Sequence, residues 1–436
     1  MRKLVFVLYL SLLGLAVPET FSQQVLPLDK AVAELLSANF EINISKKLAV
    51  VDSLNVTAGN AGMLPQIAAV VTNNNTVLNQ TQSQANGNEI EIDGAKNLNI
   101  NYGVALDWTV FDGFRMFSRK KELAEIRNQG TAEFKAAVLD RLAALYNAYF
   151  TVSVLQTQVA TLDEVIRVSE ERLRIVQARF QIGKAARLEV LNAEVDLNAD
   201  RSQRLELQQV LSDTKVSLSG ILGRRDFVDF TVENLPQQLL TLDKEALRAK
   251  MIAENPTLQL GQINKRIAEQ QLRQAKSSRY PTLSVNTGYN LIRNQTPFGF
   301  VTESTGRNFT YGFTARLNLF DGFNQNRLER VAKTQVEIAR LAEDQVLVQL
   351  QAQFDQLFSR YLFAIERLGV ERENETLAAR NLEITDDKFK IGTVSAIEYR
   401  TAQNNFSQAK LRLADAALDV ELLVVAIEQL CGTLKV

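Results

Sequence analysis

Four segments of the chain show an alternation of apolar and polar residues. The alternation is clearest in 98–111, 281–292 and 308–320, and it is weaker in 66–79. A period of two predicts a strand with one apolar and one polar face, and each segment is long enough for the roughly 9–11 residues that a tilted membrane strand needs. A half-buried antiparallel sheet and a wall between lipid and water would both produce this pattern.

Other features around these segments indicate where the strands end. Aromatic residues lie at or near the predicted strand ends, as in the interfacial girdles of membrane proteins, although a soluble sheet could also hold them. These residues are Trp108, Phe111, Phe309 and Phe320. The intervening segments 79–97 and 292–308 are rich in Asn, Gln, Thr and Gly. We predict that both are solvated loops.

The segments after the strands have a helical pattern instead. Between 114 and 181 there is no proline and Gly130 is the only glycine, and the apolar residues recur at steps of three and four, which predicts a long coiled-coil helix. The same rhythm predicts a second long helix at 323–389. Shorter helices are predicted to return at 186–222 and 395–430, and others to precede the strands at about 28–60 and 243–277.

These elements are duplicated. The motif Phe-Asp-Gly-Phe begins at Phe111 and again at Phe320, 209 residues later. Phe180 and Gly183 recur as Phe389 and Gly392, and Gly223 as Gly432, with the same offset. Equal spacing over such a distance indicates two structural repeats, 23–222 and 243–436, joined by an equatorial linker element at 223–242. It also predicts that both glycine turns lie at one end of the molecule.

The N-terminus has the features of a signal peptide over residues 1–22. Arg2 and Lys3 precede an apolar run from Leu4 to Val17, and Thr20 and Ser22 precede a plausible cleavage site before Gln23. The apolar run is too short to cross a bilayer, which takes about 20 residues. No comparable run follows, so if the mature chain enters a membrane, it must do so by strands. Four strands cannot close a barrel by themselves, so several chains would have to share one.

Composition excludes several classes of function. Lys and Arg number 49 and Asp and Glu 50, so no basic excess indicates nucleic-acid binding. The chain has no histidine, and Cys431 is its single cysteine, which removes the usual nucleophilic triads and most transition-metal ligands. We therefore expect no catalytic residue, no cofactor and no metal site.

The signal peptide, the duplicated hairpins, the Phe-Asp-Gly-Phe junctions and the glycine turns together resemble the TolC-like outer-membrane efflux protein family over nearly the whole mature chain. The resemblance implies a fold of α plus membrane β, in which a long α-helical coiled-coil barrel joins a trimeric 12-stranded outer-membrane β-barrel with four strands per chain. It also implies a Gram-negative outer-membrane location, with the helices in the periplasm. The implied partners are outer-membrane lipid, a periplasmic adaptor (membrane fusion) protein and an inner-membrane transporter of the RND, ABC or MFS type.

The resemblance also implies a gated entrance at the periplasmic end, where the family has an aromatic residue, a glycine turn, an acid and a small residue. The matching residues here are Phe180, Gly183, Glu189 and Ala193, and then Phe389, Gly392, Glu398 and Ala402. The acids would form cation-attracting rings in a trimer, but a solvated helix face explains each of them equally well.

The second turn departs from the family pattern. Members with a well-described closed state use a tyrosine and an arginine where this chain has Phe389 and Val394. Closure by packing, or by Lys388 and Lys390, remains open. The first turn carries Lys184 and Arg187 instead, and this asymmetry is where we expect the gate.

At the strand-to-helix junctions, Asp112 and Asp321 are predicted to cap the following helices, and Gly113 and Gly322 to ease the turn. The leading functional hypothesis is a passive exit duct for tripartite efflux or type I secretion. The alternatives are an exported coiled-coil tether or adhesin without a pore and, as the least favoured, an enzyme. Drugs, metals, small metabolites and secreted proteins all remain open as cargo.

Overall fold

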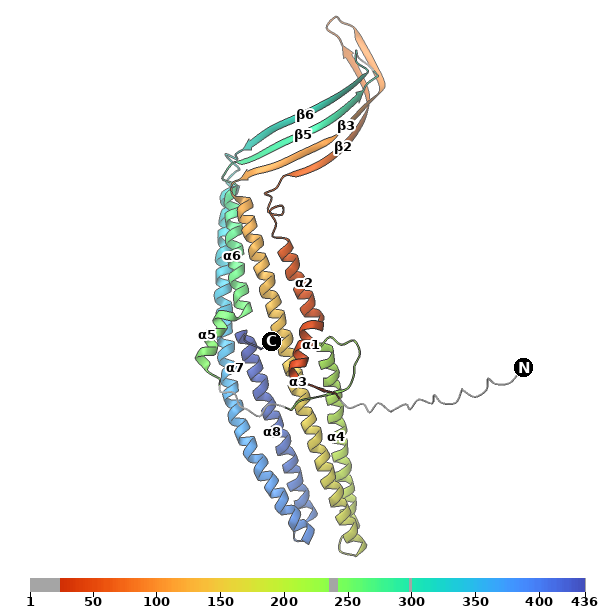
Figure 1. Ribbon diagram of the computed structural model, residues 1–436, viewed down its shortest axis with the longest axis vertical. Coiled ribbons are helices and arrows are strands. Elements are labelled where there is room, and N and C mark those ends of the chain that lie inside the picture. The colour runs from red at the N-terminus through yellow and green to blue at the C-terminus, as the bar shows by residue number, and fades with distance from the viewer. Residues whose placement is uncertain (1–23, 235–241, 298–299, 436) are drawn as a thin grey trace, which may run out of the picture.

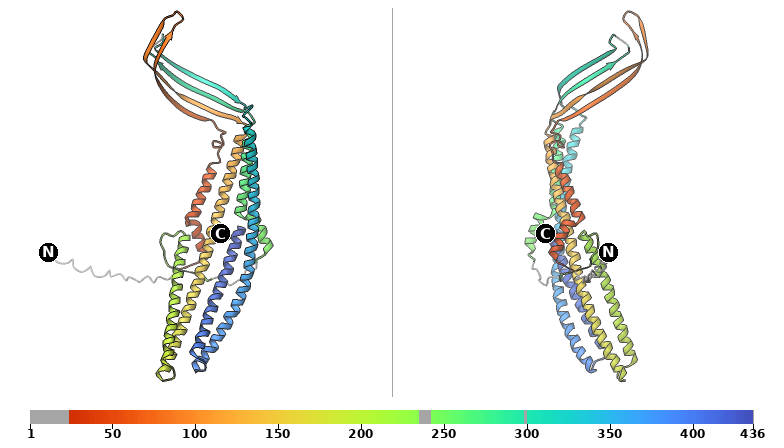
Figure 2. Two further views of the ribbon diagram at one scale, coloured as in Figure 1. Left: turned by 180° about the vertical axis from the view of Figure 1, so that it is seen from behind. Right: turned by 45° about the vertical axis from the view of Figure 1, so that its right-hand side comes forward.

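The computed structural model describes residues 24–234, 242–297 and 300–435, and the predicted signal peptide 1–22 lies outside these ranges. The molecule is elongated, with strands at one end and hairpins of long helices at the other (Figure 1). The strands lean away from the helices, and the helical hairpin turns lie farthest from them in both views of Figure 2. Among the described residues, no helix combines the length and the apolar character needed to cross a bilayer.

The strands β2 (Gln66–Ser83), β3 (Glu89–Asp112), β5 (Thr282–Gln295) and β6 (Glu303–Arg316) form one sheet in the order β2-β3-β5-β6. All neighbouring pairs are antiparallel. The pairing of β3 with β5 joins the hairpins of the two repeats. Within the described residues, β2 and β6 each keep one edge without a partner strand.

The structure corrects the predicted limits of these strands. The segments 79–97 and 292–308 were expected to be loops, yet pairing continues as far as Ser83 with Glu89 and Gln295 with Glu303. The polar side chains of these segments predicted loops. Strand pairing is made by backbone hydrogen bonds, however, so it needs no apolar face where the hairpin is solvated. At its other end, β6 stops at Arg316 instead of 320. Arg316 pairs with Thr282, the first residue of β5, so the residues that follow have no partner there.

The helices form two similar sets. The long helix α3 (Arg115–Gln181) turns into α4 (Arg187–Ile221), against predicted ranges of 114–181 and 186–222. The long helix α7 (Asn324–Ile391) turns into α8 (Ala396–Cys431), against predicted ranges of 323–389 and 395–430. Each long helix packs along a shorter helix near the strands and another near the turns, namely α2 and α4 along α3, and α6 and α8 along α7 (Figure 1).

The helices predicted at 28–60 and 243–277 are each interrupted. The first is divided into α1 (Leu28–Ala38) and α2 (Phe40–Leu54), and the second into α5 (Lys244–Glu254) and α6 (Pro256–Ser277). The prediction of single helices was wrong because an asparagine in each segment caps a new helix. The earlier end at Leu54 leaves residues 55–65 as turns and extended chain before β2.

Asn39 and Asn255 make equivalent contacts at these interruptions. The Asn39 side-chain oxygen accepts a hydrogen bond from the Ile42 N–H at 3.0 Å, and its amide donates to the Ile221 carbonyl at 2.8 Å. Asn255 accepts from Leu258 N–H at 2.9 Å and donates to the Leu430 carbonyl at 2.8 Å. Both asparagines are buried. Each therefore starts one helix and holds the end of the returning helix against the interruption.

Two apolar clusters lie at this level, one for each repeat. In the first, the fully buried Tyr149 donates to the Leu26 carbonyl at 2.7 Å and accepts from the Glu233 N–H at 3.1 Å. Leu26 ends β1 (Gln24–Leu26), which pairs in parallel with β4 (Phe230–Val232). β4 lies inside the predicted linker 223–242, of which residues 235–241 are outside the described ranges.

Candidate functional site

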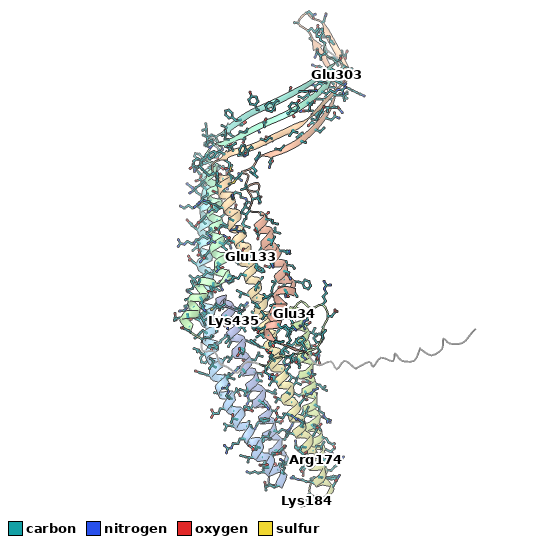
Figure 3. All side chains as sticks on the ribbon, viewed as in Figure 1. Glu34, Glu133, Arg174, Lys184, Glu303 and Lys435 are labelled. Atoms are coloured by element: carbon teal, nitrogen blue, oxygen red, sulfur yellow. The ribbon has the colours of Figure 1, made fainter. Side chains whose placement is uncertain are left out.

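The turns that follow α3 and α7 lie together at the end of the molecule farthest from the strands (Figures 1 and 3). Both have the same backbone geometry. Gly183 and Gly392 adopt φ values of +72° and +82°, in the left-handed region that glycine tolerates. Lys184 N–H donates to the Arg179 carbonyl at 2.8 Å, and Thr393 N–H donates to the Lys388 carbonyl at 2.9 Å. This is the hydrogen-bond pattern of a Schellman motif, so these glycines are required for the helix ends.

The acids of the expected entrance cap the returning helices. Glu398 accepts from the backbone N–H and the hydroxyl of Ser395, at 2.8 and 2.9 Å. These hydrogen bonds lower the pKa of Glu398. Glu189 accepts from the Ala186 N–H at 3.3 Å, and Ala186 offers no hydroxyl in return. Capping accounts for the position of both acids, and a cation-attracting role remains a proposal.

The two aromatic residues of the turns lie in different surroundings. Phe389 is only 1% exposed, whereas Phe180 is 39% exposed. Phe389 stacks on Tyr399 with 4.6 Å between ring centroids and packs with Val176 and Val190 of the other hairpin. Val394 packs against the same cluster, partly buried. We name Val176, Val190, Phe389 and Tyr399 the tip cluster; it joins the two helical hairpins by apolar contact.

Arg179 adds a polar link between the hairpins. Its guanidinium lies 4.8 Å from the centroid of the Phe389 ring. It also donates to the backbone carbonyls of Phe389 and Lys390. Carbonyls at the C-terminus of a helix carry partial negative charge, so this contact is electrostatically favourable. In the first turn, by contrast, Arg187 lies 5.9 Å from the ring of Phe180 on its own hairpin, and Lys184 is exposed.

Tyr399 connects the tip cluster to a charged pair on α7. Its hydroxyl donates to Asp386 at 3.0 Å, and Asp386 pairs with Lys390 at 2.6 Å. Burial and the neighbouring Asp386 carboxylate raise the pKa of Tyr399. The tyrosine therefore stays neutral and acts as a hydrogen-bond donor. Lys390, one of the two lysines considered for closure, is engaged within its own helix by this pair.

A buried polar layer lies beside the tip cluster. Arg400 of α8 makes a bidentate contact with Asp200 of α4, at 2.7 and 2.9 Å. Asp200 also accepts from Ser169 of α3 at 2.5 Å. Arg172 of α3, 3% exposed, pairs with Asp196 of α4 at 2.7 Å. The two arginines and two aspartates balance in charge, as buried ions require.

Gln403 completes this layer, which we name the polar layer. Its side-chain amide donates to the Ser169 hydroxyl at 2.6 Å and to the Val165 carbonyl at 3.2 Å, and it is 1% exposed. The layer therefore links α8 to both helices of the first hairpin. A loss of one partner would leave a charge buried without compensation, so separation of the hairpins here costs free energy.

Sequence reasoning placed the two turns and their glycines but did not find Arg179, Tyr399 or the polar layer. A signal was present in the repeat itself. At the 209-residue offset, Arg400 corresponds to Leu191, Asp200 to Ala409 and Tyr399 to Val190. Each of these polar residues thus has an apolar residue at the equivalent position of the other repeat, so its contact is specific to one hairpin.

A groove runs beside these residues between α3 and the α7–α8 hairpin, with a volume of about 550 Å³. Val165, Val168 and Leu382 contribute apolar surface to it. Its charged lining residues are of both signs, namely Glu164, Glu171, Glu383, Asp386, Arg167 and Lys390. Three of these acids already form ion pairs, Glu164 with Lys410, Glu171 with Arg174 and Asp386 with Lys390.

The residues at the strand-to-helix junctions have a structural role. Asp112 accepts from the Met116 N–H at 2.9 and 3.1 Å, and Asp321 accepts from the Gln325 N–H at 2.7 Å. Gly113 and Gly322 adopt φ values of +71° and +67°. A Cβ on Gly113 would lie 2.2 Å from the Ser277 carbonyl oxygen, so only glycine fits there. Each aspartate thus accepts from an N–H of the first helical turn, while Phe114 and Phe323 hold the N-cap positions without a side-chain cap.

Comparison with known proteins gives consistent relatives. The chain is 23% identical over 314 residues to the outer membrane protein TolC of Vibrio cholerae, covering 70% of this chain and 71% of that protein. It is 21% identical over 328 residues to the outer membrane efflux protein BepC of Brucella suis, covering 73% and 69%.

Solved structures show the same fold. The outer-membrane channel OprN superposes with a TM-score of 0.76 at 16% identity, covering 93% of this chain and 89% of that one. The CmeC outer membrane channel of Campylobacter jejuni superposes with a TM-score of 0.78 at 14% identity, covering 93% and 85%. The family model described as outer membrane efflux protein matches residues 50–224 and 247–433. With most of its length matched in both repeats, the chain belongs to the outer membrane efflux protein family.

Proposed function

We propose that this outer-membrane efflux channel is a homotrimer whose periplasmic entrance is opened by partner proteins. The observation that carries the proposal is the open edge on each side of the chain. β2 and β6 are the outer strands of the sheet, and they run in opposite directions. β6 of one copy can therefore pair with β2 of the next in the same antiparallel manner. Three copies would supply a closed barrel of twelve strands, without edges exposed to lipid.

The outer helices near the strands, α2 and α7, also expose apolar residues on the sides where the sheet has its unpaired edges. On α2, the exposed residues Phe40, Ile44 and Leu48 recur every fourth position. On α7, Val331, Ile338, Leu341 and Val348 are exposed at the spacing of a coiled-coil seam. α2 and α7 are the outer helices at this level (Figure 1). An α2 seam against the α7 seam of the next copy would extend the helical layer into a tube continuous with the barrel.

The tube would serve as a passive duct from the periplasm to the exterior, in a tripartite efflux or a type I secretion system. The family is one of channels, not of enzymes. Energy would come from an inner-membrane transporter, coupled through a periplasmic adaptor. The helical turns face the periplasm, so the adaptor would engage this end. The groove beside α3 has apolar surface from Val165, Val168 and Leu382, which suits the apolar face of a helical segment of the adaptor.

The entrance would be gated by movement of the α7–α8 hairpin relative to the α3–α4 hairpin. Arg179, the tip cluster and the polar layer all join these hairpins within one chain. Phe389 and Val394 would contribute by packing, in place of the polar links found in other members of the family. Phe389 and Val394 would thus hold the gate through partners that lie on α3, α4 and α8.

The test is the mass of the purified protein and its conductance in planar bilayers. We expect the mass of three mature chains and stable single-channel steps in lipid. The alternative function, an exported tether or adhesin, predicts a soluble fraction and no conductance. A monomer that inserts no pore would refute the proposal, whereas a trimer with steady conductance would exclude the tether.

A further inference from the structure

A band of positive charge surrounds the strand-to-helix junctions. It comprises residues 115–127 of α3, 266–279 from α6 onward and 324–337 of α7, which together hold twelve Lys and Arg but five Asp and Glu. The whole chain has 49 and 50, so the remaining residues hold 37 and 45. The positive excess is therefore confined to this band, directly below the strands. Three of the five acids are already paired with arginines of the band, namely Glu122, Glu125 and Glu329.

Exposed aromatic residues lie next to the band. Phe114 contacts Phe111 and Tyr280, with centroid separations of 5.1 and 6.1 Å, and Phe323 contacts Phe320 at 5.5 Å. Phe114 and Phe323 are 57% and 69% exposed. Both adopt positive φ, at +68° and +62°, which bulky residues rarely do. Glycine would suit that backbone better, so the repeated phenylalanine indicates a use for its side chain.

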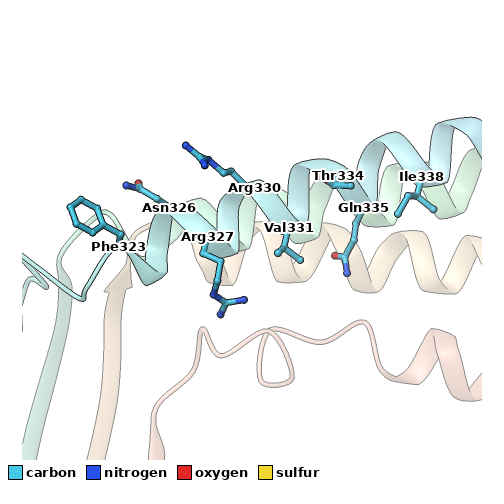
Figure 4. Close-up of a pocket in the computed structure, with 8 residues that line it drawn as sticks. All are labelled: Phe323, Asn326, Arg327, Arg330, Val331, Thr334, Gln335 and Ile338. Carbon is cyan, nitrogen blue, oxygen red and sulfur yellow. The ribbon is translucent and has the colours of Figure 1, made fainter.

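Each repeat places a cation one or two helical turns beyond its exposed phenylalanine. In the first repeat, Phe114, Phe117 and Lys121 follow one another at helical spacing, and all are exposed. At the 209-residue offset, the second repeat has Phe323, Asn326 and Arg330. Figure 4 shows Phe323, Asn326 and Arg330 projecting from one side of the first turns of α7, with Arg327 on another side.

The Asn326 side-chain oxygen of the second repeat accepts a hydrogen bond from Arg279 at 2.7 Å, which leaves its amide N–H groups to donate to a ligand. Among the described residues, no ion pair joins Lys121 or Arg330 to an acidic side chain. The second repeat offers a guanidinium and an amide near the exposed ring of Phe323. An exposed aromatic ring with a cation one or two turns away matches the boundary between acyl chains and head groups.

We propose that each strand-to-helix junction binds an anionic glycerophospholipid of the periplasmic leaflet, of the phosphatidylglycerol or cardiolipin type. At the first junction, Lys121 binds the lipid phosphate. At the second junction, Arg330 binds the phosphate and the Asn326 amide donates to it. Phe114, Phe117 and Phe323 lie against the glycerol and the first carbons of the acyl chains. The charge of the band selects anionic over zwitterionic head groups. The inference rests on the outer-membrane location and on the trimeric tube proposed above.

Native mass spectrometry of the purified full-length mature protein tests this directly. The protein is incubated with phosphatidylglycerol or with phosphatidylcholine of matched acyl chains, and the retained lipid is counted. We expect wild type to retain phosphatidylglycerol preferentially. Each neutralised cation should weaken retention about fivefold, so Lys121→Gln with Arg330→Gln should weaken it on the order of 25-fold. The charge-preserving pair Lys121→Arg with Arg330→Lys should retain the lipid.

The matched control is Arg380→Gln, which removes an exposed cation of α7 about 75 Å farther along the helix. It should leave lipid retention unchanged. Equal retention of phosphatidylglycerol by the double variant and this control would overturn the proposal, as would equal retention of both lipids by wild type. If the cations face the lumen instead, the double variant will shift the reversal potential in phosphatidylcholine bilayers without any loss of lipid, which also overturns it.

The same spectra separate this inference from the proposed trimer. A monomeric wild type that still prefers phosphatidylglycerol would refute the trimer and leave the lipid site standing. A conducting trimer without lipid preference would refute the lipid site alone. Melting curves of the two double variants show whether a loss of lipid retention reflects a loss of folding. The charge-preserving variant changes the same two positions, so equal melting temperatures of the two variants would exclude a folding defect.

Discussion

The contact between Arg400 and Asp200 offers the sharpest test of the proposed gate. The perturbation is Asp200→Asn, which keeps the shape of the side chain and removes its charge. One of the two hydrogen bonds of 2.7 and 2.9 Å would be lost, because the amide nitrogen of asparagine cannot accept, and the other would lose the negative charge of its acceptor. The partly buried Arg400 would therefore lose its bidentate partner. Loss of one partner of a buried ion pair costs about 3–5 kcal/mol. Asp196 at 3.7 Å remains as a second partner, so we expect about 2 kcal/mol.

This loss should act on the gate as well as on stability. If opening separates α8 from α4, the contact stabilises the closed state and is absent from the open state. A loss of about 2 kcal/mol then raises the ratio of open to closed protein about 30-fold in each protomer. Single-channel recording measures that ratio as open probability. Arg400→Gln should have a similar effect, and the double variant should add little to either single variant, because the three changes remove one shared contact.

The matched control lies one residue away. Arg201 pairs with Glu170 at 2.8 Å, and both side chains are about half exposed. This pair joins α4 to α3 within the first hairpin, so it does not link the two hairpins. An exposed pair of this kind contributes at most about 1 kcal/mol, so Arg201→Gln should change open probability less than about fivefold. If Asp200→Asn and Arg201→Gln have equal effects, or if the effects of Asp200→Asn and Arg400→Gln are additive, the polar layer is not the lock.

Three further predictions concern stability, measured by thermal or denaturant unfolding. Asn255→Ala should cost about 2 kcal/mol, because it removes a helix cap and the hydrogen bond to the Leu430 carbonyl. Gly432→Ala should cost about 2–3 kcal/mol, because its φ is +71° and the new Cβ would lie 2.7 Å from the Glu254 carbonyl oxygen. Burial, and then the Glu428 carboxylate, raise the pKa of Glu421 above 4.5 in the folded protein. The folded protein therefore holds this proton more tightly than the unfolded chain, and it loses stability as the pH rises through the folded-state pKa. Glu421→Gln should therefore raise the melting temperature at pH 8 by about 1–2 °C and leave it unchanged at pH 4.

Each of these has a control in the same fold. Asn39→Ala should match Asn255→Ala, since the two asparagines make equivalent contacts. Gly220→Ala should be neutral or stabilising, because nothing lies within 4 Å of its Cβ position and alanine favours a helix. A Gly432→Ala protein as stable as Gly220→Ala would contradict the steric argument. For Glu421, an equal effect at pH 4 and pH 8 would show that the charge is not responsible.

The long helices were predictable because their information is local and redundant. Apolar residues at steps of three and four run through α3 for many turns, so no single position decides the assignment. The strand limits were less predictable, since pairing depends on the partner strand. Ser83 and Glu89 are polar residues on a solvated hairpin, yet they pair, whereas the apolar Leu317 and Leu319 continue the alternation without a partner.

The interruptions at Asn39 and Asn255 show a related limit. An asparagine is an ordinary helix residue of low propensity unless its side chain finds a partner. Here the partners are the Ile221 and Leu430 carbonyls, which arrive from helices that end more than 170 residues away. The pairing of side chain and carbonyl exists only after the chain has folded.

The sequence by itself determined the duplication, the class of each long element, the glycine turns and the resemblance to a family of channels. These follow from local propensity and from spacing, which do not depend on distant contacts. Only the tertiary structure decided which residues join the hairpins. Arg400 reaches Asp200 across 200 residues and Arg179 reaches Phe389 across 210, because antiparallel helices bring distant positions to the same level. Glu189 and Glu398 accept hydrogen bonds from their own turns, and the groups that join the two hairpins lie where the repeats differ.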